Sequence, residues 1–223
     1  GFIKCKANKI IGTNIDLDFP SVGATENIIL ATVLSTGTTT INNAAMEPEI
    51  IDMVQFLKKM GAKIQGEGTN QIIIDGVEKL SGVSYNIMPD RIEAGTILCA
   101  VAATGGNVIL DNVMPEHLTA VINKLEETGC KIEINNKKIT LNAPRKLKSI
   151  DIKTMTYPGF PTDLQQIFAT MLVKASGTSI IVENIFESRY KYISELRKMG
   201  AKVTVEGKTA IIKGARKINA TTV

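Results

Sequence analysis

The sequence predicts an α+β fold made of three repeats of a β-α-β-α-β-β unit, in which apolar helices are buried and mixed sheets face outward. Three observations support this: regularly spaced glycines, segments that switch between helical and strand patterns, and helices that are apolar almost all round. The composition is that of a globular chain, because 44% of the 223 residues are hydrophobic and 22% are charged.

Two sets of glycines recur with one period along the chain. Gly61, Gly129 and Gly200 each end an amphipathic helix and lie 68 and 71 residues apart. A second set follows the apolar helices, 69 and 71 residues apart, and consists of Gly37, Gly106 and Gly177. Glycine is favoured after a helix because it enters the left-handed backbone region freely. Two independent markers with one period indicate three copies of a unit of about 70 residues.

The first half of each unit is an apolar helix and a strand. The helices are predicted over residues 28–34, 97–103 and 168–173, and helices that are hydrophobic all round are buried ones. The strands follow the glycine turns and are rich in β-branched residues, as in 38–43 and 178–183. A further strand is expected to enter each unit ahead of its first helix.

The second half of each unit is a helix followed by a hairpin. In the first unit the helix is predicted over residues 49–60, after Pro48, because proline suits a first helical turn. In the third unit, residues 202–206 and 209–213 alternate apolar and polar side chains on either side of Gly207, which predicts a two-stranded hairpin. Such a unit places its helices on one face of a small sheet.

Charge and composition exclude several functional classes. A net charge of +4 with no dense basic cluster disfavours nucleic-acid binding. Three cysteines without a C-x-x-C pair make a disulfide framework or a zinc site unexpected and favour a reducing cytoplasm. His117 is the single histidine, which excludes a His-rich metal cage, and no cofactor is expected. No apolar run is long enough to span a bilayer and no signal peptide opens the chain, so no membrane association is expected.

Polar or acidic residues gather where the three first helices begin. Thr25, Glu93 and Asp163 lie nearly in register in the three units. They are interpreted either as helix caps, which is the commoner role of such residues, or as parts of a site. Residues 21–25 also contain a glycine among small residues, so their backbone N–H groups can approach an anion at a helix start.

A second group of polar residues follows the strand of each unit. Glu187 and Arg189 share one side of a turn in the third unit, as either a surface ion pair or the edge of a site. The corresponding residues of the other units are Glu47 with Glu49 and Glu116 with His117. His117 is expected to be solvated at a helix start.

The cysteines are not expected to be nucleophiles. Cys99 lies inside an apolar helix and is predicted to be inert core. Cys5 and Cys130 have no neighbouring base or helix start that would lower the pKa of a thiol.

The chain resembles the enolpyruvyl transferase family from end to end. Five stretches match in order along the sequence: residues 21–25 (SVGAT), 43–50 (NAAMEPEI), 89–93 (PDRIE), 160–163 (FPTD) and 186–189 (FESR). The resemblance favours the branch that uses UDP-N-acetylglucosamine over the 3-phosphoshikimate branch, which shares the repeat but not this set.

The resemblance implies that the chain is a portion of a larger enzyme. In this family six such units form two globular domains with the substrates between them. Residues 1–88 are then a unit of one domain, and residues 89–223 are two units of the other. The loop with the general-acid cysteine, a Lys-Asn pair and two arginines have no match here, so this central-to-C-terminal portion is expected to be inactive alone.

The resemblance also assigns a reaction and site residues. The sugar 3′-hydroxyl of UDP-N-acetylglucosamine adds to C2 of phosphoenolpyruvate and phosphate is eliminated, which is the first committed step of peptidoglycan precursor synthesis. Asp163 matches the proposed catalytic base. The substrate-binding matches are Phe19, Pro20, Ser21, Val22, Gly23, Asp90, Arg91, Glu93, Ile185 and Arg189.

Two other readings remain open. The chain is alternatively a non-catalytic repeat scaffold, with its acids serving as caps, or a module that binds a nucleotide sugar. Units separated from their neighbours expose apolar helix faces, and large exposed patches usually acquire a partner. The expected partner is the remaining part of the parent enzyme or a second copy of the chain.

Overall fold

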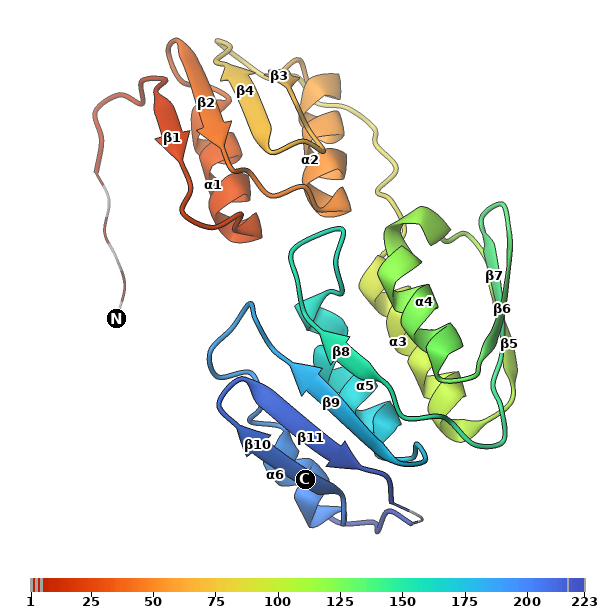
Figure 1. The fold of residues 1–223 in the computed structure, drawn as a ribbon. Helices are drawn as coiled ribbons and strands as arrows, with labels where there is room; N and C mark the ends of the chain where they lie inside the picture. The colour runs from red at the N-terminus through yellow and green to blue at the C-terminus, as the bar shows by residue number, and fades with distance from the viewer. Residues whose placement is uncertain (1, 3, 5, 216, 223) are drawn as a thin grey trace. The chain divides into compact units, whose positions relative to one another are not determined.

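The structure is a computed structural model that describes residues 2, 4, 6–215 and 217–222. The chain divides into two compact units, Gly1–Met88 and Pro89–Val223, called unit 1 and unit 2 below. Unit 1 holds the first repeat and unit 2 holds the second and third repeats (Figure 1). No helix in the described part of the chain is long and apolar enough to cross a membrane.

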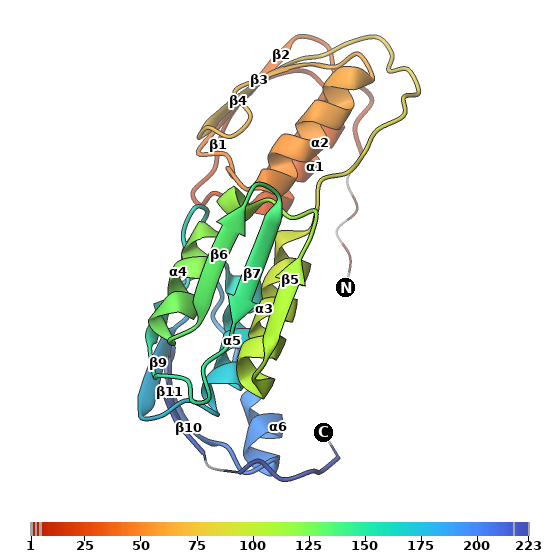
Figure 2. The same cartoon turned by 90° about the vertical axis from the view of Figure 1, so that its right-hand side faces the viewer.

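Unit 1 is a four-stranded mixed sheet covered on one face by two helices (Figures 1 and 2). Its elements are β1 (Asn14–Asp16), α1 (Val22–Thr32), β2 (Thr38–Asn42), α2 (Pro48–Lys59), β3 (Lys63–Gln65) and β4 (Gln71–Asp75). The strand order is β1-β2-β4-β3, in which β1 is parallel to β2 and the other pairs are antiparallel. The core contains Ile29 from α1, Ile50 and Val54 from α2, and Ile41 and Ile72 from the sheet.

The third repeat has the same topology. Its elements are β8 (Asp151–Lys153), the 3-10 helix η2 (Thr162–Leu164), α5 (Gln165–Leu172), β9 (Thr178–Val182), α6 (Ile193–Lys198), β10 (Lys202–Glu206) and β11 (Thr209–Lys213). The order β8-β9-β11-β10 reproduces that of unit 1, again with a parallel first pair. The predicted hairpin of residues 202–206 and 209–213 is confirmed.

The second repeat has one strand fewer than the predicted β-α-β-α-β-β repeat. Its elements are α3 (Arg91–Thr104), β5 (Asn107–Leu110), the 3-10 helix η1 (Pro115–Leu118), α4 (Thr119–Glu127), β6 (Lys131–Asn135) and β7 (Lys138–Asn142). Figure 2 shows β6, β7 and β5 side by side in a purely antiparallel sheet. The expected entering strand is absent, because residues 76–90, all of them described, connect unit 1 to α3 without forming one.

A close backbone crossing recurs where the last strand of a repeat ends. A Cβ on Gly214 would lie 1.7 Å from the carbonyl oxygen of Ala175, and a Cβ on Gly76 would lie 1.9 Å from that of Ser35. In the second repeat Ala143 takes this place and still donates its N–H to the turn after the helix, at 2.9 Å. Glycine is therefore required in the two repeats that have an entering strand, and not in the one that lacks it.

The first helices of the repeats are more deeply buried in unit 2 than in unit 1. In Figure 1, α3, α4 and α5 lie between the two sheets of unit 2. The start of α3 packs closely on η2, since a Cβ on Gly95 would lie 2.5 Å from Cδ1 of Leu164. In contrast, Leu30 of α1 is 55% exposed, whereas Cys99 of α3, also nine residues after its N-cap, is 1% exposed. The predicted burial is thus right for α5 and only partly right for α1 and for α3, whose Ile97 is 39% exposed.

Candidate active site

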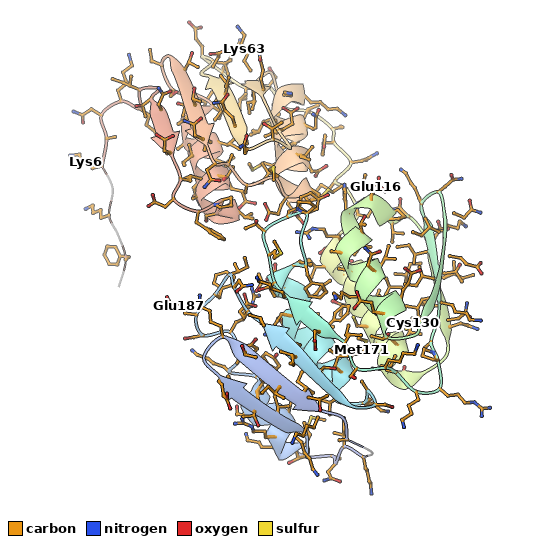
Figure 3. The ribbon with its side chains drawn as sticks, in the orientation of Figure 1. Lys6, Lys63, Glu116, Cys130, Met171 and Glu187 are labelled. Carbon is orange, nitrogen blue, oxygen red and sulfur yellow. The ribbon has the colours of Figure 1, made fainter. Side chains whose placement is uncertain are left out.

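An ion pair at the start of α5 is the centre of the candidate site. Arg189, from the loop after β9, places Nη2 2.5 Å from Oδ1 of Asp163. The Asp163 side chain is 56% exposed and that of Arg189 26% exposed, so the carboxylate faces solvent while the guanidinium is more enclosed. Glu187 marks this loop in Figure 3. Arg189 therefore pairs with Asp163, which lies 26 residues earlier in the sequence. It does not pair with its sequence neighbour Glu187.

Arg189 has two further contacts that fix its position. Its Nη1 donates to Oγ1 of Thr162 at 3.0 Å, next to Asp163 in η2. Its guanidinium also lies over the ring of Phe186, 4.9 Å from the centroid, which is a cation–π distance. An arginine held on three sides is a rigid donor, so the orientation of Asp163 is set by the loop after β9.

A fully buried carboxylate, Glu183, organises that loop. Its Oε1 accepts from Thr154 Oγ1 at 2.8 Å and from the backbone N–H groups of Ile185 and Phe186 at 2.8 and 3.2 Å. Its Oε2 accepts from Thr162 Oγ1 at 2.9 Å. Sequence reasoning missed this residue. The available signal was an acidic residue directly after a buried apolar strand.

The starts of α3 and α5 lie side by side, because Gly95 packs on Leu164. Asp90 is the N-cap of α3, and its Oδ1 accepts from the N–H groups of Ile92 and Glu93 at 2.7 and 3.2 Å. Glu93 is exposed on the first turn. The structure thus brings Asp90 and Glu93 to the same end of unit 2 as Asp163.

Arg91 is largely buried and turned toward a neighbouring loop. Its guanidinium lies 5.6 Å from the ring centroid of Tyr157. This loop, residues 155–161, leads into η2 and therefore into Asp163. Arg91 is thus positioned to stabilise the approach to the site.

The predicted nucleotide-binding residues of unit 1 lie directly before α1 and in its first turn. Ser21 is the N-cap, with Oγ accepting from the N–H of Ala24 at 3.3 Å. Gly23 is exposed, with nothing within 4 Å of where a Cβ would lie, so a ligand can approach its backbone closely. Phe19 is exposed, and Pro20 and Val22 are half-buried.

The expected register of Thr25, Glu93 and Asp163 is corrected by the structure. They lie four, three and two residues after their N-caps Ser21, Asp90 and Pro161, so they are not equivalent. Thr25 is fully buried, and its Oγ1 donates to the Ser21 carbonyl oxygen at 2.8 Å and accepts from the Ala45 N–H at 3.1 Å. The caps of α1 and α3 are Ser21 and Asp90 instead of Thr25 and Glu93, and Thr25 ties α1 to the loop after β2.

His117 is less solvated than the sequence suggested. It lies in η1, is half-buried, and its Nδ1 atom is shielded from solvent without a hydrogen-bond partner in the described part of the chain. It lines a cavity of about 320 Å³ together with Tyr157 and Pro161. The expectation of a solvated histidine was therefore wrong, because the loop of residues 155–161 packs over the start of α4.

The two described cysteines are inert, as predicted. Cys99 and Cys130 are both in the core of unit 2, and Figure 3 labels Cys130 at the end of α4. Burial raises the pKa of both thiols, and proximity to Cys130 raises the pKa of Cys99 further. Because the thiolate is the nucleophile, neither is suited to catalysis. Cys5 lies outside the described residues. No group of three His, Cys, Asp or Glu among the described residues could hold a metal ion.

These features define a class before any comparison: a triplicated α+β protein with an exposed carboxylate at the start of an inner helix, oriented by an arginine. The model of the EPSP synthase (3-phosphoshikimate 1-carboxyvinyltransferase) family matches residues 2–223. The chain therefore belongs to this family of enolpyruvyl transferases, and the resemblance seen in the sequence is confirmed.

Similar sequences are named for one branch of the family. UDP-N-acetylglucosamine 1-carboxyvinyltransferase 1 of Caldanaerobacter subterraneus subsp. tengcongensis is 50% identical over 214 residues, which are 96% of this chain and 52% of that protein. UDP-N-acetylglucosamine 1-carboxyvinyltransferase 2 of Bacillus cereus is 53% identical, covering 96% of this chain and 50% of that protein. The chain thus spans about half the length of these curated relatives.

Solved structures match the fold. The enolpyruvyl transferase NikO from Streptomyces tendae superposes with a TM-score of 0.83 at 24% identity, over 93% of this chain and 52% of that one. EPSP synthase from Acinetobacter baumannii gives a TM-score of 0.66 at 23% identity, over 94% of this chain and 50% of that one. The α+β fold with repeated units is therefore the fold of this family.

Proposed function

We propose that this chain carries part of the active site of an enzyme that transfers the enolpyruvyl group of phosphoenolpyruvate to the 3′-hydroxyl of UDP-N-acetylglucosamine. The observation that carries the proposal is the exposed Asp163 carboxylate, held by Arg189, in a chain about half identical to relatives of that name. The product would enter peptidoglycan synthesis, and the compartment would be the cytoplasm.

Asp163 has the placement that a general base needs. Its carboxylate accepts the proton of the sugar hydroxyl as the oxygen attacks C2 of phosphoenolpyruvate, provided that the hydroxyl lies within hydrogen-bond reach. The alkene carbon C3 gains a proton from a donor outside the residues assigned here, and phosphate leaves when the tetrahedral intermediate collapses. Arg189 holds the base in one orientation through both steps.

Other residues are proposed to bind the sugar nucleotide. The first turn of α1 is open to a ligand at Gly23, and Ile185 offers a backbone group in the loop that Glu183 organises. The full set of proposed binding residues is Phe19, Pro20, Ser21, Val22, Gly23, Asp90, Arg91, Glu93, Ile185 and Arg189. We also propose that residues 1–88 and 89–223 belong to two different globular domains of the complete enzyme.

A chimera tests the proposal. In the Caldanaerobacter relative, the 214-residue matching segment is replaced by the corresponding part of this chain. Release of phosphate from phosphoenolpyruvate that depends on UDP-N-acetylglucosamine is expected. A folded chimera that binds the sugar nucleotide without releasing phosphate would instead favour the binding-module reading, and one that does neither would favour a scaffold. The 223-residue chain is the control, and no turnover is expected from it alone.

A partner is proposed for the exposed face of α1. Leu30 of α1 and Leu34 in the turn directly after it are each 55% exposed, whereas α3 and α5 in unit 2 pack against each other. Self-association of the chain at high concentration, through this face, is therefore expected in sedimentation-velocity measurements. Leu30→Lys with Leu34→Lys should weaken it more than about tenfold, since burying each leucine is worth about 1.5–3 kcal/mol.

The matched control for this variant is Ile134→Lys, which changes a similarly exposed apolar residue on the sheet of the second repeat. It should leave the association intact. A wild-type chain that sediments as a monomer at every concentration would rule out self-association and leave the rest of the parent enzyme as the partner of α1.

A further inference from the structure

Glu183 is a buried carboxylate with no direct cationic partner among the described residues. It is fully buried, and its four hydrogen bonds come from two hydroxyl groups and two backbone N–H groups. The two N–H groups can only donate and the two hydroxyl groups are able to donate, so all four contacts suit a carboxylate, which accepts at both oxygens. Burying such a charge is costly, and the four hydrogen bonds offset that cost.

The hydrogen-bond directions connect Glu183 to the Asp163–Arg189 pair. Thr162 donates its single hydroxyl proton to Oε2 of Glu183, since a carboxylate only accepts. Its Oγ1 is then left with lone pairs only, and Arg189 Nη1 donates to it at 3.0 Å. Glu183 is thus linked to Arg189 through the Thr162 hydroxyl, which its negative charge polarises. Arg189 is in turn ion-paired with Asp163.

We propose that Glu183 is the positioning residue of the Asp163–Arg189 pair, acting through the Thr162 hydroxyl. Its charge fixes the hydroxyl with the oxygen toward Arg189, which holds Nη1 of Arg189 while Nη2 pairs with Asp163. The geometric part of this inference stands on the hydrogen bonds alone. Its consequence for turnover rests on the proposed function.

The substitution Glu183→Gln tests the direction of the hydroxyl with little change of shape. Three donors surround Oε1, so the amide oxygen of glutamine is held there and its NH2 group faces Thr162. The hydroxyl proton of Thr162 then loses its acceptor. Thr162 can keep accepting from Arg189 only if that proton gives up its buried acceptor, so Arg189 is partly released, while its ion pair with Asp163 remains.

Modification of arginine by phenylglyoxal, read by peptide mass spectrometry on the 223-residue chain, measures this release without any substrate. Arg189 should react about tenfold faster in Glu183→Gln than in the wild type, the factor expected for losing one hydrogen bond to a charged group. Thr162→Val removes the same link at its other end and should have the same effect, whereas Thr162→Ser keeps the hydroxyl and should keep the slow rate.

Two internal references and one control variant separate positioning from unfolding. Exposed Arg145 should react equally in all variants. Arg197, an exposed arginine whose Nε donates to the Val203 carbonyl oxygen at 2.9 Å, should keep its wild-type rate. Glu195→Gln removes the charge of a half-buried glutamate paired with Lys198 and should leave the rate at Arg189 unchanged. An unchanged rate at Arg189 in both Glu183→Gln and Thr162→Val, or a parallel rise at Arg197, would overturn the proposal.

The chimera gives the functional readout. Glu183→Gln should lower kcat about tenfold in the chimera, yet cause no further loss in an Asp163→Asn background, because residues that act as a unit are not additive. Equal losses in both backgrounds would mean a merely structural role. A chimera without turnover would refute the proposed function, while the phenylglyoxal result would still decide the role of Glu183.

Discussion

Replacing Asp163 by asparagine in the chimera is expected to lower kcat about a thousandfold and to change KM for UDP-N-acetylglucosamine little, as removal of a general base does. Asparagine keeps the size of the side chain and an oxygen that can face Arg189, but it cannot take the hydroxyl proton. The exposed position of Asp163 means that the fold should tolerate the change. Steady-state phosphate release at varied sugar-nucleotide concentration measures both constants.

The matched control is Asp111→Asn. Asp111 is also an exposed aspartate of unit 2 with a cationic partner, since its Oδ2 lies 3.0 Å from Nζ of Lys138. Lys138 begins β7, on the sheet of the second repeat, so this pair should not affect turnover. Loss of kcat by less than about tenfold in Asp163→Asn would reduce its role to binding or orientation, below what a general base contributes.

Replacing Gly214 by alanine is expected to destabilise unit 2 by about 3 kcal/mol and to lower its melting temperature by about 10 °C. The added methyl group would lie 1.7 Å from the carbonyl oxygen of Ala175, and a backbone atom cannot move aside as a flexible side chain can. The same crossing carries the hydrogen bond from the Gly214 N–H to the Gly177 carbonyl oxygen at 2.9 Å, so it cannot open without losing that bond. Thermal unfolding followed by circular dichroism measures the effect.

Gly82→Ala is the control for this change, because nothing lies within 4 Å of its Cβ position and its backbone is not in the left-handed region. Its effect should stay within about 0.5 kcal/mol, as is usual for surface substitutions. Gly214→Ala with wild-type stability would show that the turn at Ala175 can relax, and that the crossing is not as tight as the structure indicates.

The repeated architecture could be predicted from the sequence because its signals are local. Glycines after helices, β-branched strands and an alternating hairpin each act within a few residues, and they recur with one period. The missing strand of the second repeat could not be read in this way. Its absence depends on the path that the chain takes from unit 1 to α3, and residues 76–90 carry no local sequence signal of that path.

The candidate site was only partly predictable for the same reason. The resemblance pointed to Asp163 and Arg189 separately, but their pairing joins segments 26 residues apart. Glu183 escaped notice because an acid at the end of a strand reads as a solvated residue until the threonines that enclose it are known. Thr25 was misplaced in the register because a shift of one or two residues on a helix changes the face a side chain occupies.

In the three-stranded sheet of the second repeat, one edge lacks the neighbouring strand that the other two repeats have there. In the other two repeats the entering strand shields the strand after the first helix, while β5 has no strand on that side within the described part of the chain. Its Ile109 is 66% exposed. An unshielded border offers main-chain groups to any extended polypeptide, so misassembly during refolding would begin at β5 sooner than at β2 or β9.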